Sequence, residues 1–218
     1  MKRRYGSFLK VFSLLFVFTI FEGKAEESSK TLVVGELVYK EFHDPGYVYF
    51  QTEQGKKLEA AFYYRFITFE QIEKWTRGEN FELVIDDRKG VGVRRKSDHG
   101  FFKVVFARPD NPIHLLEKAC LDTAMTTLDI AGCYYQSAER WGRESDYLFR
   151  ELSRSVSKAV LAQLSDAKMK WLAYEASLMD GFYKYGEEQG GSIMRIHNAS
   201  LKSELSQSFF YQIVRFLE

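Results

Sequence analysis

The sequence predicts an α+β fold: a small N-terminal antiparallel β domain over residues 31–110, followed by an antiparallel helical domain over residues 112–217. Two observations predict this order. Up to residue 110, short runs of β-branched and aromatic residues alternate with turn residues, which is typical of strands. From Pro112 onward, apolar residues recur every three or four positions, which is typical of amphipathic helices.

The β domain is expected to form an OB-like barrel. Three strand-like runs, TLVVGELVYKEF, YVYFQT and LEAAFYYRF, are separated by the turns HDPG and EQGKK. A helical pattern then begins with Thr68 as its N-cap, places Phe69, Ile72 and Trp75 on one face, and ends at Gly78. The runs NFELVIDD, VGVRRKSDHG and FFKVVFA follow as strands. Three strands, a helix and further strands are the element order of an OB-type barrel.

Four helices are predicted after the β domain. Asn111 precedes a short helix over residues 112–123 that has Pro112 in its first turn. Thr126 begins the second helix, and Asp129 completes a variant of the capping box. Three-and-four spacing predicts one buried stripe on the second helix (Tyr134, Ala138, Trp141, Ser145, Leu148, Leu152 and Val156) and one on the third (Val160, Leu164, Ala167, Trp171, Tyr174, Leu178 and Tyr185).

Gly142 falls within the second helix, where a glycine costs about 0.8–1 kcal/mol relative to alanine. We therefore expect a neighbouring helix or a bulky ring to cross closely at this position.

The segment YGEEQGGS, residues 185–192, is predicted to end the third helix at Gly186, Gly190 and Gly191. Ser192 is expected to cap the last helix, which runs to about Phe216. A connection between two packed helices is expected to project from one end of the bundle, where acidic side chains would attract a cationic partner. The candidate partner-binding residues are Glu187, Glu188, Gly190, Gly191 and Ser192. The alternative is a solvated connector with no binding role.

The first 25 residues have the three-part layout of a secretory signal peptide. Basic residues at positions 2–4 precede an apolar run from Val11 to Phe21, and the small residues Gly23 and Ala25 predict cleavage after Ala25. The apolar run is shorter than the roughly 20 residues that span a membrane, although a retained anchor is the alternative. The sequence therefore predicts a periplasmic or secreted protein with no stable membrane insertion after cleavage.

Cleavage would make the protein weakly acidic. Removing residues 1–25 takes away five basic residues and one acidic residue, which leaves 26 Lys and Arg against 29 Asp and Glu, a net charge of −3. A stacking groove for nucleic acid would use the tyrosines and cations of the β domain, namely Tyr47, Tyr49, Tyr63, Tyr64, Arg65, Lys89, Arg94, Arg95 and Lys96. The negative net charge favours the alternative, in which the aromatic rings fill the barrel and no nucleic acid binds.

The two cysteines, Cys120 and Cys133, are expected to form a disulfide. In an oxidising compartment two cysteines usually pair. One continuous helix would separate their Cα atoms by about 19 Å, at 1.5 Å per residue, whereas the turn predicted between residues 123 and 127 brings them together. Two free buried thiols are the alternative, and a metal site is disfavoured because two thiols with no nearby histidine fall short of a closed four-ligand zinc site.

In the helical half, cysteine, aromatic and glycine residues recur at a characteristic set of spacings. Two cysteines thirteen residues apart enclose a Thr-x-x-Asp step, and an L-x-x-A-x-x-x-W-x-x-Y run, a glycine pair and a final helix follow. The residues concerned are Cys120, Thr126, Asp129, Cys133, Leu152, Leu164, Ala167, Trp171, Tyr174, Gly190, Gly191 and Ser192. This combination resembles the LprI-type lysozyme-inhibitor domain of exported bacterial proteins.

The resemblance covers residues 112–217 and leaves the β domain outside it. It departs from the family pattern at several polar positions, which are Gly142, Ser145, Asp146, Phe149, Lys168 and Glu175. The resemblance implies a helical fold and a protein partner such as a lysozyme or another muramidase.

No motif of a metalloprotease, of a serine-hydrolase nucleophile or of a phosphate-binding loop occurs in the sequence. We therefore expect no enzyme activity, no cofactor and no metal site. The leading hypothesis is an exported binding protein for a muramidase or another cell-envelope partner. The alternatives are an envelope structural or stress-associated interaction module and, third, a hydrolase without a known motif.

Overall fold

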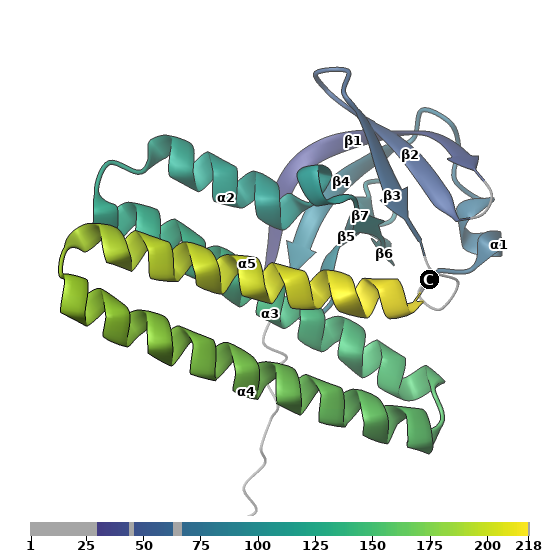
Figure 1. Cartoon of the computed structure of the whole chain (residues 1–218). Helices are drawn as coiled ribbons and strands as arrows, with labels where there is room; N and C mark the ends of the chain where they lie inside the picture. The colour runs from purple at the N-terminus through teal and green to yellow at the C-terminus, as the bar shows by residue number, and fades with distance from the viewer. Residues whose placement is uncertain (1–29, 44–45, 63–66, 218) are drawn as a thin grey trace, which may run out of the picture.

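The computed structural model describes residues 30–43, 46–62 and 67–217. It has an N-terminal antiparallel sheet followed by a helical region (Figure 1), so the predicted α+β class is confirmed. The predicted signal peptide, residues 1–25, lies outside the described residues. Within the described part of the chain, no helix combines the length and the apolar character needed to cross a membrane.

The strands are arranged in the order β6-β5-β4-β1-β2-β3-β7, and every adjacent pair is antiparallel. Their bounds are β1 (Thr31–His43), β2 (Tyr47–Thr52), β3 (Lys57–Ala61), β4 (Asn80–Asp86), β5 (Gly90–Arg95), β6 (Phe101–Lys103) and β7 (Val105–Phe106). Only Val104 separates β6 from β7. This one segment therefore pairs with β5 at one edge of the sheet and with β3 at the other, which closes the sheet into a barrel.

The long strand β1 pairs with both β2 and β4, and its register shifts twice, between Val33 and Gly35 and between Tyr39 and Glu41. Such bulges bend a strand and increase its twist, which a small closed barrel requires. With the helix α1 (Phe69–Ile72) between β3 and β4, the order β5-β4-β1-β2-β3 agrees with the predicted OB-like arrangement.

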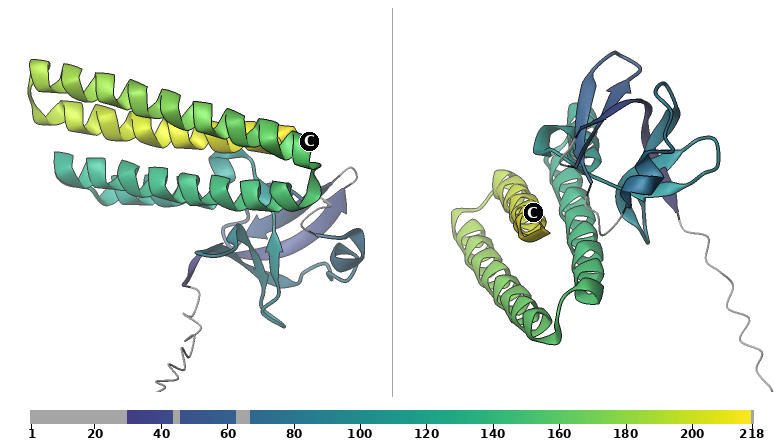
Figure 2. Two further views of the ribbon diagram at one scale, coloured as in Figure 1. Left: turned by 90° about the horizontal axis from the view of Figure 1, so that it is seen from below. Right: turned by 90° about the vertical axis from the view of Figure 1, so that its right-hand side faces the viewer.

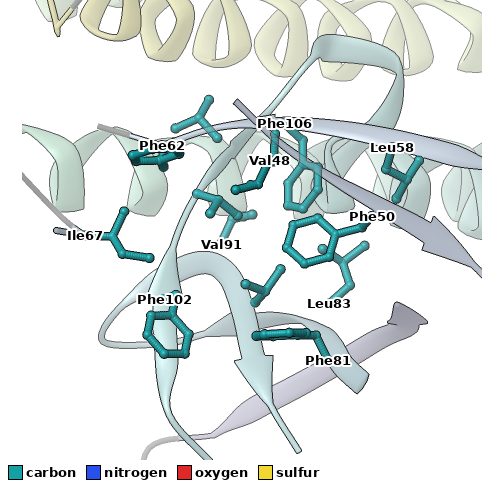
Figure 3. Packing of buried hydrophobic residues seen from close by; sticks show 14 of the residues in the cluster. Val48, Phe50, Leu58, Phe62, Ile67, Phe81, Leu83, Val91, Phe102 and Phe106 are labelled. Carbon is teal, nitrogen blue, oxygen red and sulfur yellow. The ribbon is translucent and has the colours of Figure 1, made fainter. Parts of the chain in front are cut away.

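Aromatic and branched side chains from all sides fill the barrel (Figure 3). The indole of Trp75 packs among these side chains, with its ring centroid 5.4 Å from that of Tyr39, 4.7 Å from that of Phe81 and 4.9 Å from that of Phe102. The predicted helix from Thr68 to Gly78 is too long, because α1 ends at Ile72. The backbone N–H of Trp75 instead donates to the backbone carbonyl of Ile72, three residues earlier. This tight turn brings the side chains of Ile72 and Trp75 into the core.

The helical region consists of α2 (Pro112–Thr123), α3 (Thr127–Ser155), α4 (Lys158–Gln189) and α5 (Ser192–Leu217). Both predicted caps are confirmed: the Asn111 side chain accepts from the N–H of Ile113, and Thr126 and Asp129 form a reciprocal capping box. Helices α3 and α5 pack together through Trp141 and Phe210, whose ring centroids are 5.1 Å apart. The two views of Figure 2 place α4 on the side of the helical region farthest from the barrel.

The space beside Gly142 on α3 is open, because a Cβ atom there would meet nothing within 4 Å. The expected close crossing of a helix or ring at Gly142 is therefore wrong. The helix contributes its core contacts from the neighbouring positions Trp141 and Ser145, which are both buried.

One hydrophobic cluster continues from the barrel into the helices and includes Val91 and Phe106 together with Trp141, Leu148 and Phe210. An ion pair between Lys103 of β6 and Glu144 of α3 lies at this junction, and both side chains are only 2% exposed. The backbone N–H of Val91 also donates to the Glu144 carboxylate at 2.8 Å. These contacts fix the barrel against α3.

Gly90 makes room for the ion pair. It adopts a left-handed conformation with φ of 74°, and a Cβ atom at this position would collide with the Glu144 carboxylate. An L-residue at position 90 would therefore be strained and would also displace the buried carboxylate.

Candidate protein-binding surface

Cys120 of α2 and Cys133 of α3 form a disulfide with their Cα atoms 5.7 Å apart, as predicted. The chain reverses direction between the two helices at Ala124–Thr126, which allows cysteines thirteen residues apart to meet. The disulfide joins the end of α2 to the first turns of α3.

The candidate residues Glu187 and Glu188 lie in the last turn of α4 and not in a loop, which corrects their predicted placement. Only Gly190 and Gly191 connect α4 to α5, and both have positive φ, 69° and 103°. Ser192 is the first residue of α5. The five candidate residues therefore remain adjacent, at the tight end of a helical hairpin.

The prediction that Gly186 ends the third helix is wrong. Gly186 lies within α4, where a Cβ atom would be 3.3 Å from Cβ of Met194 on α5. This glycine therefore allows the two helices to approach closely just before the hairpin turn. In the sequence, a glycine that permits a close contact between helices cannot be distinguished from a glycine that ends a helix.

The predicted buried stripe of α4 is only partly covered in its first half, where Leu164 and Trp171 are half-buried and Ala167 is exposed. Trp171 stacks on Phe209 of α5, with ring centroids 5.4 Å apart and an interplanar angle of 18°. Beyond this point the stripe is open: Tyr174 is 54% exposed, Tyr185 is 53% exposed, and the neighbouring Phe182 is 38% exposed. The prediction of a buried stripe is therefore wrong for α4, most clearly in its second half.

The second half of α4 buries a different face. Its two buried residues are Glu175 and Met179, and Gly186 lies on the same side. At 3.6 residues per turn these positions lie roughly 100–140° around the helix axis from Tyr174. Glu175 is paired with Lys202 of α5 at 2.7 Å, so a charged contact on this other face helps to hold the two helices together.

The open face of α4 is hollowed into a shallow groove of about 520 Å³. Its lining residues all come from α4, and they are Tyr174, Ser177, Leu178, Gly181, Phe182 and Tyr185. The small residues Ser177 and Gly181 leave room between the larger side chains, and a Cβ atom at Gly181 would meet nothing within 4 Å. Phe182 was not singled out in the sequence, although it follows Leu178 by four residues and so widens the same apolar face.

One carboxylate borders this groove. Glu188 follows Tyr185 by three residues and therefore lies on the same face, whereas Glu187 points to the opposite side of the helix. Among the described residues Glu188 forms no ion pair, and the nearby Lys184 is bonded to Asp180 at 2.6 Å. That hydrogen bond raises the pKa of Lys184.

The hydroxyl groups of Tyr135 on α3 and Tyr183 on α4 lie 2.9 Å apart and fix the end of α4 against α3. Burial, followed by this hydrogen bond, raises the pKa of Tyr135 to about 12. Tyr135 therefore stays protonated at physiological pH.

The cations of the β domain do not form an open stacking groove among the described residues. Arg94 is paired with Glu82 at 2.7 Å, Arg95 with Asp98, and Lys96 with Glu36. Three other residues that were considered for a stacking groove, Tyr63, Tyr64 and Arg65, lie outside the described residues.

No three His, Cys, Asp or Glu side chains are grouped to hold a metal ion within the part of the chain that the structure describes. Comparison with known proteins finds no matching family model, no matching curated protein and no matching solved structure. The open face of α4, with Glu188 at its end, is therefore the candidate functional surface on geometric grounds alone.

Proposed function

We propose that the protein is exported and binds a cationic muramidase, or a similar enzyme of the cell envelope, without catalysing a reaction itself. The observation that supports this proposal is the uncovered aromatic face of α4, with Tyr174, Phe182 and Tyr185 around a groove and Glu188 beside it. We call these four residues and the groove the α4 surface.

The composition of the α4 surface favours a protein as the partner. Contiguous exposed apolar patches are uncommon on monomeric proteins and indicate interaction sites. Tyrosine is enriched among the residues that contribute most to binding energy at protein interfaces. Two tyrosines and a phenylalanine on a helix that is fixed at both ends provide such anchors with little loss of conformational entropy on binding.

Electrostatics favours a cationic partner. The chain after residue 25 has a net charge of −3, and Glu188 places one carboxylate beside the groove. Complementary charge accelerates association more than it tightens the final complex. The resemblance of residues 112–217 to LprI-type lysozyme-inhibitor domains supports a muramidase as the class of partner.

The test is the binding kinetics of the mature protein, residues 26–218, with a purified cationic lysozyme. Phe182→Ser should weaken binding about tenfold, the loss expected for truncating one anchor at the centre of an interface. Glu188→Lys should slow association and reduce the dependence of the association rate on salt.

Matched controls come from the same helix. Met169 is exposed but does not line the groove, and Glu187 lies on the opposite face, so Met169→Ser and Glu187→Lys should each leave binding nearly unchanged. Equal effects of Glu187→Lys and Glu188→Lys would show that only net charge matters and would contradict the placement of the site. Absence of binding by the folded protein would contradict the proposed function.

A further inference from the structure

A second groove, of about 210 Å³, lies between three helices at the other end of α4. Its lining residues are Phe149 and Leu152 of α3, Leu164, Ala167, Lys168 and Trp171 of α4, and Phe209, Gln212, Ile213 and Phe216 of α5. We call it the three-helix groove. All but two of these side chains are apolar.

The interior of the three-helix groove is buried and largely apolar. Leu152 and Ile213 are buried, and the stacked rings of Trp171 and Phe209 join α4 to α5 beside them. Pockets for drug-sized ligands measure about 300–1,000 Å³. The volume of this groove therefore suits a slender ligand, such as one alkyl chain, better than a compact ring system.

One cation lies at this groove. The ammonium group of Lys168 is 4.8 Å from the ring centroid of Phe149 and is bonded to Asp146 of α3 at 2.6 Å. Asp146 is 56% exposed, so this ion pair is accessible to water and contributes little to stability. An anionic group of a ligand can therefore share or replace Asp146 at small energetic cost.

We propose that the three-helix groove binds a free single-chain carboxylate, a fatty acid, with its alkyl chain between α3, α4 and α5 and its carboxylate on Lys168. The apolar lining selects the chain by burial, and the single ammonium at the same groove selects an anionic head group. This inference does not depend on the α4 surface, because the two sets of lining residues share no member.

The test is calorimetric titration of the mature protein with straight-chain carboxylates of increasing length, below the concentration at which they form micelles. Each added methylene should tighten binding about fourfold until the groove is filled, which follows from about 0.8 kcal/mol per buried methylene. Alcohols of equal length should show the same dependence on chain length but bind more weakly.

The head-group contact has a matched pair of variants. Lys168→Gln should weaken carboxylate binding about fivefold and leave alcohol binding unchanged. Asp146→Asn should leave carboxylate binding unchanged or tighten it, because it releases the ammonium group for the ligand. If the Lys168–Asp146 ion pair were only structural, Lys168→Gln and Asp146→Asn would change the affinity for carboxylates in the same direction.

The contact between the ligand's alkyl chain and the groove is tested by filling the groove with a larger side chain. Ala167 is exposed and lines the groove, so Ala167→Phe should abolish binding while the fold is retained. Ala173, exposed on the same helix but outside the groove, provides the control Ala173→Phe.

Three results would overturn the proposal: no binding of any monomeric carboxylate, binding that Ala167→Phe leaves intact, or equal binding of alcohols and carboxylates. Binding to phospholipid vesicles in place of free carboxylates would identify a membrane contact and would also contradict it.

Discussion

Replacing Lys103 with methionine is expected to destabilise the folded protein by about 3–5 kcal/mol. Both partners of the Lys103–Glu144 ion pair are 2% exposed, so the substitution leaves a buried carboxylate. Among the described residues, the remaining hydrogen bond to the Glu144 carboxylate would come from the N–H of Val91. The cost is that of an uncompensated buried charge, because methionine has nearly the volume of lysine and creates no large cavity.

Glu144→Gln and the double variant complete a double-mutant cycle with Lys103→Met. Glu144→Gln keeps the acceptor for Val91 and removes the negative charge, so Lys103→Met with Glu144→Gln leaves a neutral, nearly isosteric pair. The double variant should be at least about 2 kcal/mol more stable than Lys103→Met alone, since neutral replacements of buried ion pairs are well tolerated. Lys96→Met is the control, because the Lys96–Glu36 pair is 35% and 50% exposed and should contribute less than about 1 kcal/mol.

The pH dependence gives an independent check. Burial lowers the pKa of Lys103 from 10.5, against the opposing effect of Glu144. Between that lowered pKa and 10.5 the unfolded chain binds more protons than the folded protein, so the contribution of Lys103 to stability rises with pH. Glu144→Gln lowers this pKa further, and its destabilisation should therefore shrink as the pH rises through this window.

The assay is urea unfolding followed by circular dichroism, with the midpoint and the slope fitted for each variant. A loss below about 1 kcal/mol for Lys103→Met, similar to that of Lys96→Met, would refute the reasoning. So would a double variant that is less stable than Lys103→Met alone.

Three further predictions follow from the sequence and the geometry. Replacing Cys120 and Cys133 with alanine should lower the free energy of unfolding by about 3 kcal/mol in the chain-entropy model, and adding a reductant to the unaltered protein should give the same loss in urea unfolding. The hydrogen bond from Arg95 lowers the pKa of Asp98 from 3.8 to about 2, so stability should fall as the pH drops through this range, and Asp98→Asn should lack that portion of the acid transition. N-terminal sequencing of the exported protein should begin at Glu26, and an intact, membrane-embedded N-terminus would contradict the predicted cleavage.

Local hydrogen bonding is what the sequence predicted best. The caps at Asn111 and Thr126 were predicted correctly because donor and acceptor lie within three residues of each other in the chain. The disulfide followed from the turn between those helices. The hairpins β1–β2–β3 and β4–β5 were likewise accessible, since each turn is formed by adjacent residues. The pairings of β1 with β4 and of β3 with β7 join segments that are distant in the chain, and local patterns do not predict them.

Features that depend on tertiary neighbours were missed. The periodicity of α4 identified an apolar face but not the element that covers it, so Tyr174 was expected in the core and is exposed. Lys103 and Glu144 were not singled out because a charged residue in a strand or helix is usually solvated, and only the packing of the barrel on α3 buries them. Gly186 was predicted to end a helix because glycine commonly does so. Only the position of Met194 on α5 shows that this glycine instead permits a close contact between two helices.

The most direct test of the proposed function is a titration of lysozyme activity on cell-wall substrate with the oxidised mature protein. If the α4 surface binds a cationic muramidase, activity should fall in proportion to added protein and reach a minimum near equimolar addition. Phe182→Ser should shift that titration to higher concentrations, whereas Met169→Ser should not. Full lysozyme activity in the presence of a large molar excess of the folded protein would contradict the proposal.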